Sequence, residues 1–173
     1  LVNVQAALAL CQAIDIDIEA AVRAVKEFKG LPHRCELVSD NEGVLWVNDS
    51  KATNIGATAA AVEGLRPMIN GRLLLIAGGV GKGADFRELQ STLERVDILL
   101  TIGEDGPRIG QLFNGSRQVK SLQQAVELAA SLVQTGDMVL LSPACASFDQ
   151  FQNFEHRGDS FRHAVEALYV NSA

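Results

Sequence analysis

The chain has 173 residues, of which 47% are hydrophobic and 21% are charged, and its formal net charge is −6. This composition excludes a disordered or low-complexity chain and predicts one full hydrophobic core with a small appendage. The acidic balance argues against nucleic-acid binding, and no apolar run approaches the roughly 20 residues that cross a bilayer. We therefore expect a cytoplasmic protein, and the start at Leu1 rather than Met predicts a piece of a longer chain.

The first part of the chain has a helical pattern. Apolar residues recur at three- and four-residue spacing between Val2 and Phe28, which predicts two short helices with a polar joint. Residues 30–32, Gly-Leu-Pro, then end the pattern, because Gly favours a helix C-terminus and Pro cannot continue a helix. We expect a domain boundary here, between residues 1–30 and 31–173.

Beyond this boundary the pattern alternates between strands and helices. Residues 34–38 and 44–47 predict a hairpin, and continuous apolar runs predict strands buried on both faces at 73–77, 98–102 and 138–141. Helices are predicted over 54–65, 86–96, 107–113, 122–133 and 155–169. This alternation predicts an α/β fold with a mostly parallel sheet, which binds ligands at the carboxyl ends of its strands.

Four polar segments lie at the domain boundary or directly after predicted strands, where core packing does not require them. They are Leu31–Arg34, Asn48–Asn54, Gly78–Gly83 and Ser142–Ser147. Because all four fall at the same predicted edge of the sheet, we expect them to converge on one binding site.

The segment Asn48–Asn54 combines a carboxylate, an ammonium, hydroxyls and amides just before a helix. Helix capping requires only one of these groups, so their combination favours a ligand site. The ammonium of Lys51 suits a phosphate or a carboxylate, the hydroxyl of Thr53 can donate to an anion, and Asp49 can accept from a sugar hydroxyl.

The glycine-rich segment Gly78–Gly83 follows a predicted strand and precedes a predicted helix. Its Gly79-x-Gly81-x-x-Ala84 spacing is only a weak match to a dinucleotide fingerprint, and a P-loop is excluded by its spacing. We interpret the segment as a turn that brings Lys82 and backbone N–H groups to an anion at a helix start. A plain surface lysine in a tight turn is the alternative.

The segment Ser142–Ser147 leaves the last predicted strand through small residues, which favours close approach of a ligand to the backbone. Ser147 is not in a G-x-S-x-G motif, so a serine hydrolase is unsupported. The phenylalanines that follow, at 148, 151 and 154, are expected mainly to pack in the core. The histidines and cysteines show no metal-ligand or disulfide spacing, so we expect reduced, mostly buried thiols and no metal site.

In order and spacing, the four segments resemble the C-terminal part of the Mur ligases of peptidoglycan synthesis, and within them the branch that adds D-glutamate. Asp49–Asn54 is the most specific part, because the sister ligases resemble one another in carrying a Tyr-Ala-His type sequence there. The resemblance spans essentially the whole chain. It implies that residues 1–30 are the end of a central ATPase domain and that 31–173 form a Rossmann-like C-terminal amino-acid-binding domain.

The resemblance also implies an activity. The whole protein would use ATP and Mg²⁺, bound mainly by a central domain outside this sequence, to phosphorylate UDP-N-acetylmuramoyl-L-alanine. The amine of D-glutamate would then attack the acyl phosphate. The fragment alone is expected to be inactive, and the whole protein to be a bacterial monomer whose missing N-terminal and central domains are its partners in the same chain.

The same resemblance implies roles for single residues. Lys82 and Thr53 would hold the side-chain carboxylate of D-glutamate, and Ser147, Phe148 and Phe154 its α-carboxylate end. ATP or its phosphates would be met by Asn3, Arg34, Asp49 and Lys51 and, as a weaker expectation, by His33.

Other functions stay open at this point. A dinucleotide-binding oxidoreductase would need an acidic residue after the next strand to hold a ribose, and Glu104 and Asp105 are so placed. A regulatory or interaction module would expose a large apolar patch. Within the enzyme class, another Mur ligase or a folylpolyglutamate synthetase relative is a further alternative.

Overall fold

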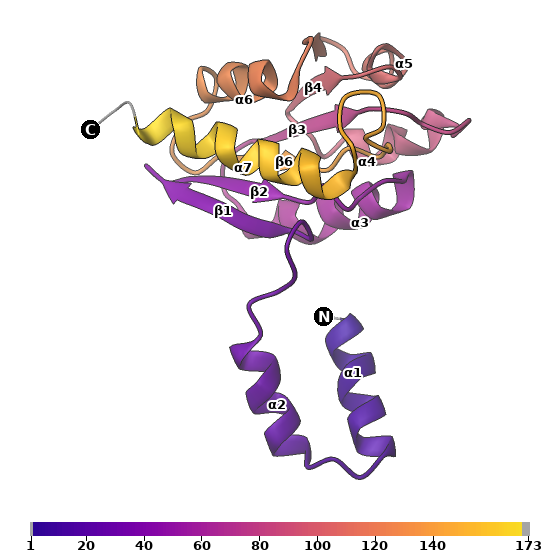
Figure 1. Cartoon of the computed structure of the whole chain (residues 1–173), viewed down its shortest axis with the longest axis vertical. Helices are drawn as coiled ribbons and strands as arrows, with labels where there is room; N and C mark the ends of the chain where they lie inside the picture. Colours follow the sequence, from indigo (N-terminus) through magenta and orange to yellow (C-terminus); the bar gives the residue numbers. More distant parts are fainter. Residues whose placement is uncertain (1, 171–173) are drawn as a thin grey trace. The chain divides into compact units, whose positions relative to one another are not determined.

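The computed structural model describes residues 2–170 and divides the chain into two compact units, Leu1–Leu31 and Pro32–Ala173 (Figure 1). The smaller unit consists of the two predicted helices, α1 (Val2–Ala13) and α2 (Ile18–Glu27). Asp17 begins α2, because its carboxylate accepts hydrogen bonds from the N–H groups of Glu19 and Ala20.

The larger unit is built on a six-stranded sheet in the order β1-β2-β6-β3-β4-β5. Only β1 is antiparallel to its neighbour, and all other pairs are parallel. The α/β prediction is therefore confirmed. The strands are β1 (Glu36–Asn41), β2 (Val44–Asn48), β3 (Leu73–Gly78), β4 (Ile98–Ile102), β5 (Arg117–Gln118) and β6 (Met138–Leu141).

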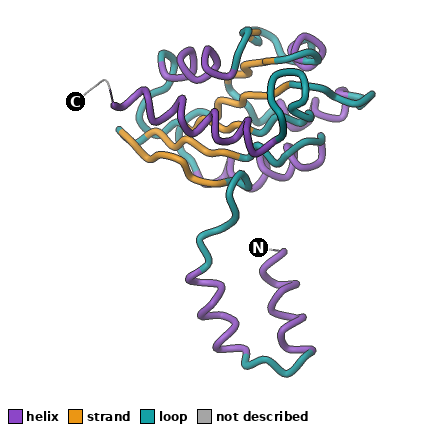
Figure 2. Tube along the Cα trace, viewed as in Figure 1, coloured by secondary structure: helices purple, strands orange, loops and turns teal. Residues whose placement is uncertain are grey.

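Helices cover both faces of this sheet, as Figure 2 shows. Side chains of β3 alternate between two cores: Leu73 and Leu75 face one helical layer, and Leu74 and Ile76 face the other. The first layer holds α3 (Ile55–Leu65), η2 (Phe86–Leu89), α4 (Gln90–Leu93) and α5 (Gly106–Gly110), and the second holds α6 (Leu122–Ala130) and α7 (Phe154–Val170). A short turn, η1 (Arg66–Met68), follows α3.

Several predicted boundaries were wrong for local reasons. The first strand begins at Glu36 rather than 34, because His33 and Cys35 have positive φ angles of 61° and 45° and interrupt the extended backbone. The helix predicted over 86–96 is a 3₁₀ turn and a single α turn that end at Leu93. The two-residue strand β5 was missed, because two residues carry no periodic signal.

Asp137 joins several segments at the amino ends of the central strands. Its side chain, in a residue only 3% exposed, accepts hydrogen bonds from the backbone N–H groups of Arg72 and Gln134 and from the Arg72 guanidinium. Burial by itself raises the pKa of Asp137, but these donors outweigh it and hold the pKa below its ordinary value of 3.8.

Replacing Asp137 with Ala should lower the free energy of unfolding at neutral pH by about 2–4 kcal/mol, because it leaves Arg72 and two N–H groups without their acceptor. The folded-state pKa is depressed, so the stabilisation is complete above the ordinary pKa and is lost as the pH falls through the folded-state pKa. Urea unfolding of both proteins at a series of pH values measures this. A stability gap that stays constant down to about pH 2 would contradict it.

Candidate functional site

The strand order brings three of the polar segments together at the carboxyl edge of the sheet. Because β6 lies between β2 and β3, the segments that follow these three strands are neighbours. They then diverge, since the chain continues from β2 to α3 on one face of the sheet and from β6 to α7 on the other. Such a divergence leaves a crevice at the strand ends, which is where open α/β sheets bind ligands.

A depression of about 460 Å³ lies at this edge, and all three segments line it. Thr53 comes from the segment after β2, Gly81 and Lys82 from the glycine-rich segment, and Ala144 from the segment after β6. Within residues 2–170, the hydroxyl of Thr53 and the ammonium of Lys82 make no hydrogen bond or ion pair. The depression is therefore lined by the unpartnered side chains of Thr53 and Lys82, together with the carboxylate of Glu88, which has no partner among the described residues either.

Capping of α3 does not involve Thr53. The side chain of Asn54 accepts a hydrogen bond from the N–H of Ala57 at 3.0 Å and begins the helix. The hydroxyl of Ser50 instead donates to the carbonyl of Phe154 at 2.8 Å. The fold therefore has a use for Asn54 and Ser50 and leaves Thr53 available.

The backbone at this edge adopts conformations that non-glycine residues rarely take. Lys82 and Ala144, which line the depression, have φ angles of 52° and 60°, and His33 and Cys35 lie at the same edge with positive φ. Such outliers persist where the surrounding structure forces them, often at binding sites. Patterns of residue type did not reveal this feature.

The glycine-rich segment differs from the sequence interpretation in one respect. It leads into a 3₁₀ turn rather than a long helix, and the carboxylate of Asp85 accepts from the N–H of Arg87 at the start of that turn. The expected anion site at a helix start is therefore occupied by the protein's own carboxylate. Lys82 remains as the cation that the segment presents.

A second group of predicted residues gathers around the ring of Phe154, at the start of α7. The ammonium nitrogen of Lys51 lies 3.7 Å from the centre of this ring, a cation–π contact. The His33 ring meets the same phenyl ring edge-on, with centroids 6.0 Å apart, and its Nδ1 lies 3.1 Å from the side-chain nitrogen of Asn48. Arg34 is next in the chain and is exposed.

Asp49 points inward and is only 7% exposed. Its carboxylate accepts hydrogen bonds from the Ser142 hydroxyl at 2.8 Å and from the backbone N–H of Cys35 at 3.2 Å. Burial raises the pKa of Asp49 above its ordinary value, although these donors and the nearby charge of Arg34 oppose the rise. This carboxylate ties the ends of β2 and β6 together.

Arg157 of α7 is the residue at this edge that the sequence patterns did not single out. It is 1% exposed, and its guanidinium donates to the hydroxyl and the carbonyl of Ser50 and to the carbonyl of Cys145 at 2.9–3.1 Å. Burial lowers its pKa to about 10, so it stays charged at neutral pH. It forms no ion pair with any described residue.

The remaining predicted residues fall in different environments. Ser147 is 2% exposed, whereas Phe148 is 69% exposed, so the core interpretation was wrong for Phe148; Phe151 and Phe154 are half-buried. Asn3 is exposed in the smaller unit. Of the thiols, only that of Cys145 is buried, so the expectation of mostly buried thiols was also wrong.

The comparisons with known proteins identify the family of the chain. The family model described as Mur ligase, glutamate ligase domain matches residues 33–145, which include the segments after β2 and β3. The chain belongs to this Mur ligase domain family.

Two relatives within the Mur ligases are similar over nearly the whole chain. The UDP-N-acetylmuramoylalanine–D-glutamate ligase of Hahella chejuensis is 50% identical over 170 residues, and that of Shewanella oneidensis is 51% identical over 166 residues. Each comparison covers 96% of this chain but only 38% of the relative.

The fold is also similar to that of E. coli FolC solved in complex with ADP. The TM-score is 0.70 at 22% identity, over 98% of this chain and 39% of FolC, and this likeness concerns the fold alone.

The hydrogen bonds of Asp105 argue against a dinucleotide site at this residue. Its carboxylate already accepts from the N–H of Gly81 at 2.7 Å and from Arg108 at 2.7 Å. A ribose hydroxyl would have to compete with both donors, which weakens the oxidoreductase alternative.

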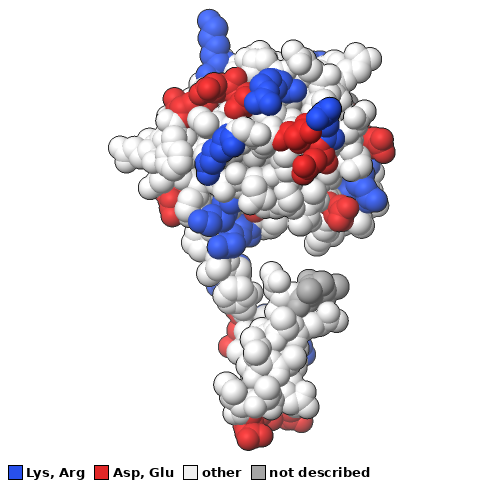
Figure 3. All heavy atoms as spheres, turned by 90° about the vertical axis from the view of Figure 1, so that its right-hand side faces the viewer, with Lys and Arg blue, Asp and Glu red and all other residues white. Residues whose placement is uncertain are grey.

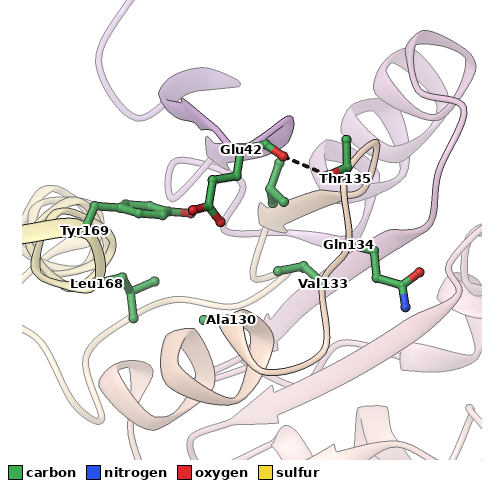
Figure 4. A pocket seen from close by; sticks show the side chains of 8 residues that line it. Glu42, Ala130, Val133, Gln134, Thr135, Leu168 and Tyr169 are labelled. Atoms are coloured by element: carbon green, nitrogen blue, oxygen red, sulfur yellow. Dashed lines mark hydrogen bonds between the residues drawn. The ribbon is translucent and has the colours of Figure 1, made fainter. Parts of the chain in front are cut away.

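A second depression, of about 370 Å³, lies away from the predicted site (Figure 4). It is lined in part by Val133, Leu168 and Tyr169, and the Tyr169 ring and the Glu42 side chain point toward one another there. Thr135 donates a hydrogen bond to the Glu42 carbonyl beside it. None of the predicted site residues lines this depression.

Charges on the face of the larger unit shown in Figure 3 are mixed, with Lys and Arg atoms interspersed among Asp and Glu atoms. In the part of the chain that the structure describes, no three His, Cys, Asp or Glu side chains gather closely enough to hold a metal ion. No helix among residues 2–170 has the length and apolar character of a membrane span.

Replacing Arg157 with Lys should lower the free energy of unfolding by about 2–4 kcal/mol, because a single ammonium cannot reach all three acceptor groups of the guanidinium. Arg162→Lys, on the same helix, is the matched control: Arg162 pairs with Glu36 at a half-buried position, so its loss should cost about 1 kcal/mol or less. Urea unfolding measures both changes. Equal losses would contradict the assigned role of Arg157.

Proposed function

We propose that this chain is the C-terminal, amino-acid-binding part of a Mur ligase that adds D-glutamate to UDP-N-acetylmuramoyl-L-alanine. The observation that carries the proposal is the pair of unpartnered side chains, Thr53 and Lys82, on one depression at the carboxyl edge of the sheet. Relatives about 50% identical over almost the whole chain are named as ligases for D-glutamate, which supports this substrate.

D-glutamate carries two carboxylates, so its site needs donors at both ends. In this proposal the ammonium of Lys82 and the hydroxyl of Thr53 bind the side-chain carboxylate, because charge-assisted hydrogen bonds to a carboxylate are the strong ones. The Ser147 hydroxyl, which makes no hydrogen bond within residues 2–170, and the rings of Phe148 and Phe154 serve the α-carboxylate end.

In this proposal, the residues around Phe154 bind the phosphate groups of the reaction. Lys51, Arg34 and, more weakly, His33 would offset the charge of ATP phosphates or of the acyl phosphate. Asp49, which the sequence placed at the ribose, is left out of this role, because its buried carboxylate already accepts from Ser142 and from the N–H of Cys35. Asn3 of the smaller unit would meet the adenine. The smaller unit would be the end of a central ATPase domain, which would hold Mg²⁺ and most of the ATP.

Positioning and charge neutralisation carry most of the work in such a reaction. ATP activates the substrate carboxylate as an acyl phosphate, and the amine of D-glutamate displaces phosphate from it. This chain's contribution is to orient the amino acid through Lys82 and Thr53 and to balance phosphate charge through Lys51 and Arg34. The protein would act as a monomer in the bacterial cytoplasm, and the fragment by itself would be inactive.

In the full-length ligase, Lys82→Ala should raise the KM for D-glutamate by about 10- to 100-fold, because a charge-assisted hydrogen bond to the substrate is lost. The KM for ATP should change by less than about twofold, since Lys82 is assigned to the amino acid rather than the nucleotide. Steady-state assays of phosphate release, with each substrate varied in turn, measure both constants.

Arg95→Ala is the control for a general effect of lost positive charge, because Arg95 is an exposed cation just before β4, at the opposite edge of the sheet. It should leave both constants unchanged. An unaltered D-glutamate KM in Lys82→Ala would remove Lys82 from the amino-acid site.

A further inference from the structure

Asp105 contacts the glycine-rich segment at two points, although it lies in the segment after β4 and lines no depression described above. Its carboxylate oxygen Oδ2 accepts from the backbone N–H of Gly81 at 2.7 Å. Its own backbone N–H donates to the carbonyl of Gly79 at 2.9 Å. Side chain and backbone of one residue thus hold both ends of the stretch that leads to Lys82.

Arg108, at the next turn of the chain, strengthens this attachment. Its Nη1 donates to Oδ1 of Asp105 at 2.7 Å, and its Nη2 donates to the carbonyl of Ala84, beyond Lys82, at 3.3 Å. The guanidinium carbon also lies 5.0 Å from the centre of the Phe86 ring. The glycine-rich segment is therefore held on both sides of Lys82.

The fit between the two segments is tight at Gly81. A Cβ atom placed there would lie 2.5 Å from the Phe86 ring and 3.0 Å from the carboxylate of Asp105. Only glycine lets the backbone N–H approach the carboxylate this closely.

Lys82 needs such support, because its φ of 52° lies in the left-handed region that a side chain disfavours. A free glycine-rich turn would release this conformation and redirect the ammonium. The hydrogen bonds from Arg108 and from the Gly81 N–H also hold the pKa of Asp105 below its ordinary value, so the carboxylate is charged at neutral pH.

We propose that Asp105 is a positioning residue for Lys82: by accepting from the Gly81 N–H, it fixes the turn that aims the Lys82 ammonium at the depression. The inference rests on the proposed function, since it takes the ligand of Lys82 to be D-glutamate. Asp105 itself touches no substrate.

The test uses Asp105→Ala and Asp105→Asn in the full-length ligase, with Lys82→Ala as the reference. Asp105→Ala should raise the KM for D-glutamate by about tenfold and leave the KM for ATP within about twofold, the same pattern as Lys82→Ala. Asp105→Asn retains an oxygen that accepts from Gly81 and should recover most of the wild-type KM.

Asp97→Ala is the matched control. Like Asp105, Asp97 accepts from a backbone N–H, that of Leu73 in β3 at 2.8 Å, and lies 3.7 Å from an arginine, but at the amino end of β3 and β4. Both Ala variants should lower the Tm, and only Asp105→Ala should raise the D-glutamate KM. An equal rise in Asp97→Ala would assign the effect to stability and overturn the proposal.

The variants distinguish the role of Asp105 from the assignment of Lys82 to D-glutamate. A raised D-glutamate KM in Lys82→Ala but not in Asp105→Ala overturns the role of Asp105 and leaves the proposed function intact. No change in either variant overturns the assignment of Lys82 and this inference with it. If Asp105→Ala does not fold, Arg108→Gln removes the exposed partner that orients the carboxylate, and a D-glutamate KM unchanged in that variant overturns the proposal.

Discussion

The carboxyl edge of the sheet depends on one buried guanidinium. Arg157 lies in the interior without an ion pair to any described residue, so its charge is stabilised only by the hydroxyl and carbonyl of Ser50 and the carbonyl of Cys145. A buried charge is costly unless hydrogen bonds satisfy its donors. The segments after β2 and β6 must therefore keep the conformations that present these oxygens, and α7 must start where the guanidinium reaches both.

Further contacts between the segments add to this constraint. Val80 and Ala146 exchange two backbone hydrogen bonds, which join the segments after β3 and β6. Asp149 accepts from the N–H of Glu104, which joins the segments after β6 and β4. An edge connected in this way can hold unfavourable φ angles such as that of Lys82. Polar groups that make these connections are used by the fold, whereas the side chains of Thr53 and Lys82 make none and stay available to a ligand.

The fold could be predicted from the sequence because strands and helices have repetitive, local patterns of apolar residues. The apolar runs of β3, β4 and β6 predict strands covered on both faces, and polar segments after them predict where a site lies. The sequence could not show which polar residue each contact uses. The sequence predicted that both Asp49 and Thr53 bind a ligand. Only the tertiary structure shows that the Asp49 side chain points inward. The roles of Arg157 and Asp105 depend on partners 107 and 24 residues away, beyond the reach of any local pattern.

The segment after β2 also explains how one domain can serve two substrates in the proposed reaction. Lys51 and Thr53 are two residues apart in a tight turn, in which the N–H of Thr53 donates to the carbonyl of Lys51 at 2.8 Å. Their side chains nevertheless lie in different places: Lys51 lies over the Phe154 ring, and Thr53 lines the depression with Lys82. Formation of an amide from an acyl phosphate requires the amine and the activated carboxylate to be held side by side. In the proposed reaction, a turn that carries Lys51 for phosphate and Thr53 for the amino acid two positions apart would fix that distance through the backbone.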